Sequence, residues 1–233
     1  MNIETIKTST DKTIVGFSND YLFNIIKNGN EFPDDFLLPI IDKYVNSESV
    51  CIDVGANLGY VSIYLAQKCR KLYSIEPQPV VYLQLCANLF LNKCFNASAL
   101  NIGCHSYRCN LDFAEYQSGW AGTDNVKDIE TVKSFGALSL TQNKTGNIEA
   151  HRLDSLFSNQ KIDFIKIDCQ GADIDVILGA EEIIKQYHPV IVFEYEEDMS
   201  VKNYGRVLSD LYPFLEKYNY KITSLFEENY LLS

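Results

Sequence analysis

The strongest signal for the fold is the segment Val50-Cys-Ile-Asp-Val-Gly-Ala-Asn-Leu-Gly59. Its first five residues form a short apolar run, which is typical of a strand buried inside a parallel sheet. Gly55 ends this run, and residues 58–67 then place apolar side chains at helical spacing. The stretch therefore predicts a strand, a tight glycine turn and a helix, which together begin a βαβ unit.

Strands and helices keep alternating along the rest of the chain, except in one long interruption. Residues 104–150 are polar, contain scattered glycines and are only weakly periodic, with short strands expected near 109–113 and 148–151. We therefore expect an α/β protein with a Rossmann-like, mostly parallel seven-stranded sheet, helices on both faces and a long insertion after the third strand. The expected strands are residues 50–54, 71–75, 98–102, 163–167, 189–195, 220–223 and 230–232, and the expected helices are residues 58–67, 79–91, 174–187 and 201–211.

The 233 residues fit one domain with an added N-terminal segment, because single cores rarely exceed roughly 250–300 residues. Residues 1–48 form this segment, which we expect to end in an amphipathic helix over residues 34–45. Residues 49–233 form the main domain, and residues 104–150 are its insertion. A loop of that length is usually functional, and Trp120 within it is expected either to anchor the loop or to form a wall for a bound molecule.

Charge and composition narrow the kinds of partner. The formal net charge is −11, which disfavours binding to nucleic-acid backbones and anionic membranes. No apolar run has the length of a membrane span or of a signal-peptide core. The seven cysteines are odd in number and form no Cys-x-x-Cys pair. We therefore expect a cytoplasmic protein that acts on a neutral or cationic small molecule, glycan or protein side chain, with no nucleic-acid or membrane partner.

Ligands of parallel sheets bind beyond the carboxyl ends of the strands, where the glycine turn lies. Gly55 permits a tight turn, and the following helix offers free N–H groups to an anionic group. Glu76 ends the second expected strand, at the spacing of about 20 residues from the turn at which an acidic side chain accepts the ribose hydroxyls of a nucleoside. The alternatives are an ordinary turn and a solvated charge. Turn, spacing and strand context together favour a cofactor that contains adenosine.

The glycine spacing bears on which cofactor this is. Dinucleotide sites use Gly-x-Gly-x-x-Gly, whose second glycine makes room for the pyrophosphate, and here that position is Asn57. A cofactor without a pyrophosphate fits better, which favours S-adenosylmethionine over NAD. A nicotinamide-dependent oxidoreductase stays as an alternative.

Four blocks of sequence carry a further signal. They are Asp53-Val-Gly-Ala-Asn-Leu-Gly59, Ser74-Ile-Glu-Pro77, Arg152-Leu-Asp-Ser-Leu156 and Ile165-Lys-Ile-Asp-Cys-Gln-Gly-Ala-Asp173. In residues, order and spacing, the chain from about residue 34 to 198 resembles the FkbM-type methyltransferases. The resemblance implies a class I methyltransferase fold and O-methylation of a hydroxyl on a sugar or another small metabolite.

The resemblance also assigns roles to individual residues. It implies that Asp168 ends the fourth strand of the main domain and faces the transferring methyl group. It implies that Glu76 holds the ribose of the cofactor. The remaining cofactor-binding residues would be Asp53, Gly55, Asn57 and Gly59 at the methionine end, with Asn101 and Ile102 beside the adenine.

Two departures from the family pattern affect the expected chemistry. Gln170 stands where the family usually has a glutamate, and Asp173 is a shorter counterpart of a second glutamate. The lost carboxylate leaves open a non-catalytic module that only binds the cofactor.

Methyl transfer to a hydroxyl needs a base and an aligned acceptor. Asp168 and Asp173 are our candidates for these catalytic roles, although Asp173 is equally well explained as a helix N-cap. Asp154 is a third carboxylate that, together with these two, would offer oxygen ligands to Mg²⁺.

Overall fold

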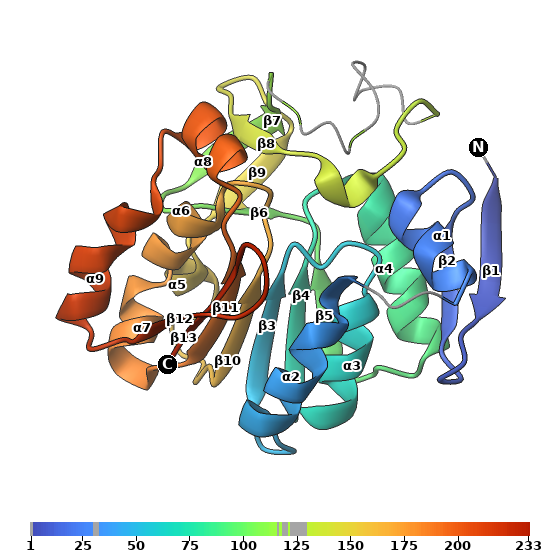
Figure 1. Cartoon of the computed structure of the whole chain (residues 1–233), viewed down its shortest axis with the longest axis horizontal. Coiled ribbons are helices and arrows are strands. Elements are labelled where there is room, and N and C mark those ends of the chain that lie inside the picture. Colours follow the sequence, from blue (N-terminus) through green and yellow to red (C-terminus); the bar gives the residue numbers. More distant parts are fainter. Residues whose placement is uncertain (1, 30–32, 116, 118–120, 122–129) are drawn as a thin grey trace.

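A seven-stranded sheet forms the middle layer of the protein in the computed structural model, which describes residues 2–29, 33–115, 117, 121 and 130–233 (Figure 1). The strand order is β12-β13-β11-β10-β3-β4-β5. The strands from β11 to β5 are parallel to one another, and β13 is antiparallel to both of its neighbours. The predicted mostly parallel sheet is therefore confirmed. Its strands are β3 (Val50–Val54), β4 (Lys71–Ile75), β5 (Ala97–Leu100), β10 (Phe164–Ile167), β11 (Val190–Glu194), β12 (Ile222–Ser224) and β13 (Asn229–Leu232).

Helices cover both faces of this sheet, as predicted (Figure 1). The helix expected over residues 79–91 has those bounds, and the one expected over 58–67 begins two residues later, at Tyr60. In the described part of the chain, no helix has both the length and the apolar character needed to cross a membrane. The helices of the main domain are α3 (Tyr60–Lys68), α4 (Pro79–Leu91), α5 (Leu153–Leu156), α6 (Asp173–Leu178), α7 (Glu181–Tyr187), α8 (Glu197–Tyr204) and α9 (Tyr212–Lys217).

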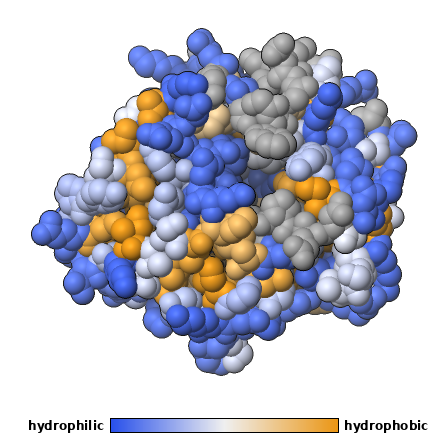
Figure 2. Space-filling model, viewed as in Figure 1, coloured by the Kyte–Doolittle hydropathy of each residue, from blue (hydrophilic) through white to orange (hydrophobic). Residues whose placement is uncertain are grey.

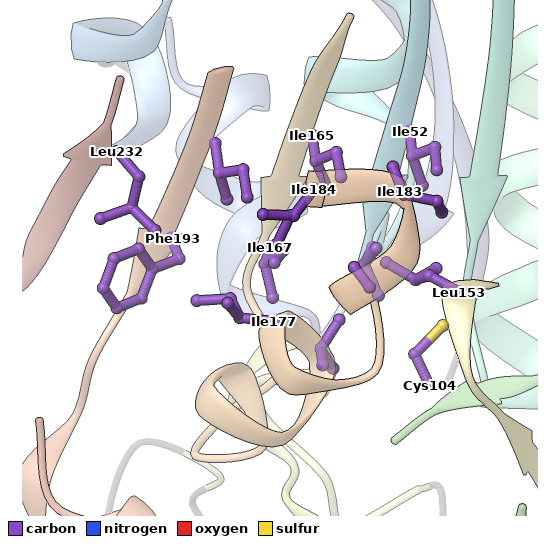
Figure 3. Packing of buried hydrophobic residues seen from close by; sticks show 14 of the residues in the cluster. Ile52, Cys104, Leu153, Ile165, Ile167, Ile177, Ile183, Ile184, Phe193 and Leu232 are labelled. Carbon is purple, nitrogen blue, oxygen red and sulfur yellow. The ribbon is translucent and has the colours of Figure 1, made fainter. Parts of the chain in front are cut away.

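The two faces of the sheet bury alternate residues of the same strand. In β3, Val50 and Ile52 belong to the core under α6 and α7, whereas Cys51 belongs to the core under α3 and α4. Successive side chains of a strand point to opposite faces, so a strand covered on both faces is apolar at most of its positions. Figure 3 shows the first of these cores, in which the labelled sheet residues Ile52, Ile165, Ile167, Phe193 and Leu232 lie near Ile177, Ile183 and Ile184 of the two helices.

Two expected helices are broken in the structure. The helix predicted over residues 174–187 consists of α6 and α7, separated at Gly179 and Ala180. The chain breaks there because Asp154 accepts a hydrogen bond from the Ile183 N–H at 3.0 Å and so caps α7 from outside. The helix predicted over 201–211 is α8, which begins four residues earlier and ends at Gly205. Gly205 has a φ of +65°, the left-handed conformation in which glycine ends helices.

The insertion has a small sheet of its own, at the top of Figure 1. The strands expected near residues 109–113 and 148–151 are confirmed as β7 (Cys109–Phe113) and β9 (Ile148–His151). They pair with β8 (Leu140–Gln142) and β6 (Gly103–Cys104), in the order β6-β9-β7-β8. A short 3-10 turn, η3 (Phe135–Ala137), precedes β8. Trp120 lies outside the described residues.

The N-terminal segment is more structured than the sequence indicates. It begins with a hairpin of β1 (Ile3–Lys7) and β2 (Thr13–Phe17), followed by α1 (Tyr21–Lys27). Instead of one helix over residues 34–45, the chain forms η1 (Pro33–Leu37) and then α2 (Leu38–Tyr44). The α-helix begins only there because Pro39, which has no N–H to donate, is tolerated in a first helical turn and not inside a helix.

Candidate functional site

Two adjoining cavities lie at the carboxyl ends of the central parallel strands. The first, which we call the β4 cavity, has a volume of about 70 Å³ and contains Glu76 in its wall. The second, the β11 cavity, has a volume of about 170 Å³ and contains Glu194. In Figure 2, hydrophilic residues lie along the left side of the hollow in the middle of the face shown. Both cavities are lined by Gly55, Asn57, Gly136, Asp168 and Gln170.

The glycine turn after β3 is held tightly by its neighbours. The N–H groups of Gly55 and Ala56 both donate to the Ile75 carbonyl at 3.0 Å. Gly55 has a φ of +72°, and a Cβ at this position would lie 1.8 Å from the carbonyl oxygen of Asp168. The missing side chain therefore admits the backbone of a neighbouring strand end, and not only a ligand as the sequence suggests. This close packing brings Asp168 to the mouth of the turn.

Glu76 lies where an acidic side chain can meet a nucleoside. Its carboxylate accepts hydrogen bonds from the N–H groups of Asn57 and Gln78, both at 2.9 Å. The side chain is buried, and this burial raises the pKa of Glu76 to about 7 although the two N–H groups oppose the shift. Ile102 lines the same cavity. Asn101 instead donates to the carbonyls of Glu76 and Pro77, at 2.8 and 3.0 Å, so its amide braces the turn beneath the cavity.

Asp53 is fully buried and lines neither cavity. It accepts a hydrogen bond from Ser62 at 2.5 Å, and its other oxygen lies 3.6 Å from the ammonium of Lys166. That ammonium also lies 3.2 Å from a carboxylate oxygen of Asp168 and donates to the Gly55 carbonyl at 3.1 Å. Asp53 therefore acts on the site by holding Lys166 in place.

Lys166 belongs to the candidate site but is not among the residues predicted from the sequence. It is buried on β10, where its ammonium connects the ends of β3 and β10. The signal was present in the sequence, because Phe164-Ile-Lys-Ile167 places one lysine inside an otherwise apolar strand. A buried lysine needs a carboxylate partner, which would have pointed to Asp53 and Asp168.

Asp168 and Glu194 form a pair of carboxyl groups in the wall of the β11 cavity. The amide of Gln170 donates to Asp168 at 3.0 Å and to Glu194 at 3.1 Å, and so bridges them. Burial and the neighbouring charge of Asp168 raise the pKa of Glu194 well above its usual range. Burial also acts to raise the pKa of Asp168, but the charge of Lys166 and hydrogen bonds from Glu194 and Gln170 outweigh it and lower the pKa.

These opposite shifts favour a proton on Glu194 over one on Asp168. Such a pair can accept a proton at Asp168 while Glu194 donates a hydrogen bond to it. Glu194 is the last residue of β11, so the end of that strand brings it beside Asp168. This pair also explains the glutamine at position 170, where the family usually has a glutamate. A neutral amide can donate hydrogen bonds to both carboxyl groups, and an ionised glutamate cannot.

Asp173 does not join this pair. Its carboxylate accepts from the N–H groups of Cys169 and Gly171, at 2.9 and 3.1 Å, and lines neither cavity. Burial and the charge of Asp168 raise the pKa of Asp173 to about 7. This geometry favours a structural role, in which Asp173 braces the turn that presents Asp168 and Gln170.

The structure does not support the expected magnesium site. Asp154 is occupied by Arg152 at 2.7 Å and by the N-terminus of α7, away from the other two carboxylates of the proposed set. Among the residues that the structure describes, no three histidine, cysteine, aspartate or glutamate side chains form a group that could hold a metal ion.

The N-terminal segment and the insertion together form a wall of the β11 cavity. Buried Asp20 accepts from the N–H groups of Phe23 and Phe135, at 2.8 and 3.0 Å, and so ties α1 to η3. Tyr21 and Gly136, one from each segment, then line the cavity. The sequence does not reveal this wall, because residues more than a hundred positions apart build it.

Comparisons with known proteins indicate the family. Residues 53–222 match the Methyltransferase FkbM domain family. The chain is 26% identical over 160 residues to Methyltransferase sdnD of Sordaria araneosa, covering 58% of this chain and 62% of sdnD. It is also 26% identical over 196 residues to AMB antimetabolite synthetase AmbE of Pseudomonas aeruginosa, covering 70% of this chain and 9% of AmbE. The chain thus spans less than two thirds of either relative.

Solved structures show the same fold. Methyltransferase FkbM from Methylobacillus flagellatus KT superposes with a TM-score of 0.51 at 16% identity, covering 92% of this chain and 61% of that one. Trm5b from Pyrococcus abyssi superposes with a TM-score of 0.50 at 14% identity, covering 100% of this chain and 54% of that one. At such identities these likenesses establish the fold alone.

The family match decides between the two cofactors that the glycine turn left open. It supports S-adenosylmethionine as the methyl donor, and it does not support a nicotinamide-dependent oxidoreductase. The match covers residues 53–222, which is most of the chain and includes Gly55, Glu76 and Asp168. The chain therefore belongs to the FkbM methyltransferase domain family.

Proposed function

We propose that the protein transfers a methyl group from S-adenosylmethionine to a hydroxyl of a sugar or another small metabolite. The observation that carries this proposal is the pair of Asp168 and Glu194, whose carboxyl groups are bridged by the Gln170 amide in the wall of the cavity beside the glycine turn. A hydroxyl must lose its proton during methyl transfer, and a carboxylate at this position can take it.

The residues of the β4 cavity fit the methyl donor. The buried carboxylate of Glu76 would accept the ribose hydroxyls, and Ile102 would contact the adenine. Gly55 and Asn57 line both cavities and would hold the methionine end between them. When bound, S-adenosylmethionine supplies an electrophilic methyl group.

The residues of the β11 cavity would then act on the acceptor. Asp168 accepts the hydroxyl proton, and Lys166 keeps Asp168 ionised until the acceptor arrives. Glu194 stabilises the ionised form by donating a hydrogen bond to it. The walls around Tyr21 and Gly136 exclude water and align the acceptor hydroxyl for in-line attack.

The β11 cavity offers carboxyl groups and, among the described residues that line it, no unpaired cation, which supports a neutral or cationic acceptor. Asp168, Glu194 and Glu196 line it, and burial raises the pKa of Glu196 to about 7. Lys166 is already engaged by two carboxylates, so it offers little to a phosphate group. A small molecule or glycan without phosphate fits this lining better than a nucleic acid does. Location in the cytoplasm and the absence of membrane partners stay predictions.

The test is transfer of labelled methyl from S-adenosylmethionine to a panel of glycans and hydroxylated metabolites. Asp168→Asn should lower turnover by about 10²-fold or more, the scale of losing a general base, while S-adenosylhomocysteine still binds. Lys161→Met, at an exposed lysine away from both cavities, is the matched control and should keep wild-type turnover. Full turnover in Asp168→Asn would refute the role of Asp168. Tight cofactor binding without transfer to any acceptor would favour the non-catalytic binding module instead.

A further inference from the structure

A third cavity, which we call the hairpin cavity, lies between the β1–β2 hairpin, α2 and α3. Its volume is about 530 Å³, and its walls include Thr8, Thr10, Lys12, Asp35 and Tyr60. The first four of these precede residue 53, where the family match begins. The methyl-transfer site proposed above does not use this cavity.

Lys12 is the unusual residue of the hairpin cavity. Its side chain is only 7% exposed. Its ammonium lies 4.8 Å from the ring centroid of Tyr60 and 5.4 Å from that of Tyr64, and both rings also line the cavity. Two aromatic faces offset only part of the cost of removing an ammonium from water. The charge of Lys12 is therefore incompletely compensated by its surroundings, and burial accordingly lowers its pKa.

The other buried lysine provides a comparison within the same molecule. Lys166 is 5% exposed, and its ammonium contacts two carboxylates and a backbone carbonyl. Lys12 has only the two rings as contacts of its ammonium among the residues that the structure describes. Asp35 raises the pKa of Lys12 from a distance, but its carboxylate accepts a hydrogen bond from the Tyr60 hydroxyl at 3.3 Å. A buried ammonium that contacts aromatic rings but no carboxylate would gain a charged partner from a bound anion.

The cavity offers further groups that suit an anion. The hydroxyls of Thr8 and Thr10 lie 3.0 Å apart on the turn that carries Lys12, and Thr8 accepts the Lys12 backbone N–H at 3.1 Å. This hydrogen bond fixes the lysine backbone relative to the hydroxyl-bearing wall. The net charge of −11 disfavours a polyanion here, so a small molecule is the better occupant.

We propose that the hairpin cavity binds a small molecule through an anionic oxygen group, a phosphate or a carboxylate, with Lys12 as its charged ligand. Tyr60 also lines the β11 cavity, so the anion would occupy the other side of a wall that the two cavities share. The proposal does not depend on the identity of the methyl acceptor.

Calorimetric titration of the full chain with inorganic phosphate tests the proposal, at an ionic strength held constant with potassium chloride. A second titration with malonate distinguishes a carboxylate from a phosphate ligand. We expect the wild type to bind at least one of the two probes and Lys12→Met to bind it at least tenfold more weakly. Lys12→Arg, which keeps the charge, should recover binding. The matched control is Lys7→Met on the same hairpin, where the lysine is exposed and paired with Asp11, and its affinity should stay within twofold of the wild type.

A melting experiment in anion-free buffer separates ligand binding from a purely structural role. Lys12→Met should melt at or above the wild-type temperature, because it replaces an incompletely compensated charge with an apolar side chain of similar length. If Lys12 only clamps the hairpin onto Tyr60 and Tyr64, Lys12→Met should instead melt lower. Equal probe affinity in Lys12→Met and the wild type, or no binding of either probe by the wild type, would overturn the proposal.

Discussion

Glu76 makes the affinity for the cofactor product depend on pH in a way that the structure predicts. Burial raises the pKa of its carboxyl group from 4.5 to about 7. Ribose hydroxyls are hydrogen-bond donors, so they favour the ionised carboxylate over the protonated carboxyl. Below its pKa the carboxyl group must first release its proton, and affinity then falls by about tenfold for each pH unit. We expect S-adenosylhomocysteine to bind about 30-fold more weakly at pH 5.5 than at pH 8.5.

Isothermal titration calorimetry of S-adenosylhomocysteine across this range measures the effect. Repeating it in buffers with different ionisation enthalpies should show that binding releases nearly one proton per complex near pH 6. Asp173 and Glu196 also have pKa values raised to about 7, so Asp173→Asn and Glu196→Gln serve as controls that keep the dependence. Glu76→Gln should bind weakly at every pH. An affinity that does not change between pH 5.5 and 8.5 in the wild type would refute the role of Glu76.

Three further predictions concern the residues that shape the site. Gly55→Ala should lower the free energy of urea unfolding by more than about 2 kcal/mol, because its Cβ would meet the Asp168 carbonyl, whereas Gly205→Ala, with a similar φ and open space, should cost only about 1 kcal/mol. Equal costs would contradict the close packing. Asp173→Ala should lower the free energy of unfolding by about 1–3 kcal/mol, because it leaves two N–H groups without an acceptor. The folded fraction of this variant should keep most of the wild-type turnover. A variant of wild-type stability that has lost turnover would instead indicate a catalytic role for Asp173. Asp20→Ala should raise the KM for the acceptor and leave the Kd of S-adenosylhomocysteine nearly unchanged. An unchanged KM together with a raised Kd would show that the wall formed by α1 and η3 does not contact the acceptor.

The central sheet could be predicted from the sequence because its strands are apolar on both faces. Val50 and Cys51 face different cores, and only a continuous apolar run satisfies both. The breaks within helices could not be predicted in the same way. A Cβ at Gly179 would lie 2.4 Å from the carbonyl oxygen of His105, which explains the glycine between α6 and α7. Asp154, from another element, caps the second of these helices. Both causes exist only once the chain has folded.

The candidate site shows the same division between local and long-range causes. Gly55 and Glu76 were identifiable because their positions relative to strand ends carry the signal. The pairing of Asp168 with Glu194 depends on two strand ends that are neighbours in the sheet but 26 residues apart in the chain. The contact between Asp20 and Phe135 spans 115 residues, so no pattern of neighbouring residues could indicate that the N-terminal segment lines the acceptor side.

A structure of the complex with S-adenosylhomocysteine directly tests whether the cofactor binds in the β4 cavity with its sulfur toward Asp168. We predict that the ribose hydroxyls contact the carboxylate of Glu76 and that the adenine lies against Ile102. The sulfur should face the β11 cavity, with Asp168 nearer to it than Asp173. A nucleoside bound outside the β4 cavity, or a sulfur that faces away from Asp168, would contradict the proposed methyl-transfer site.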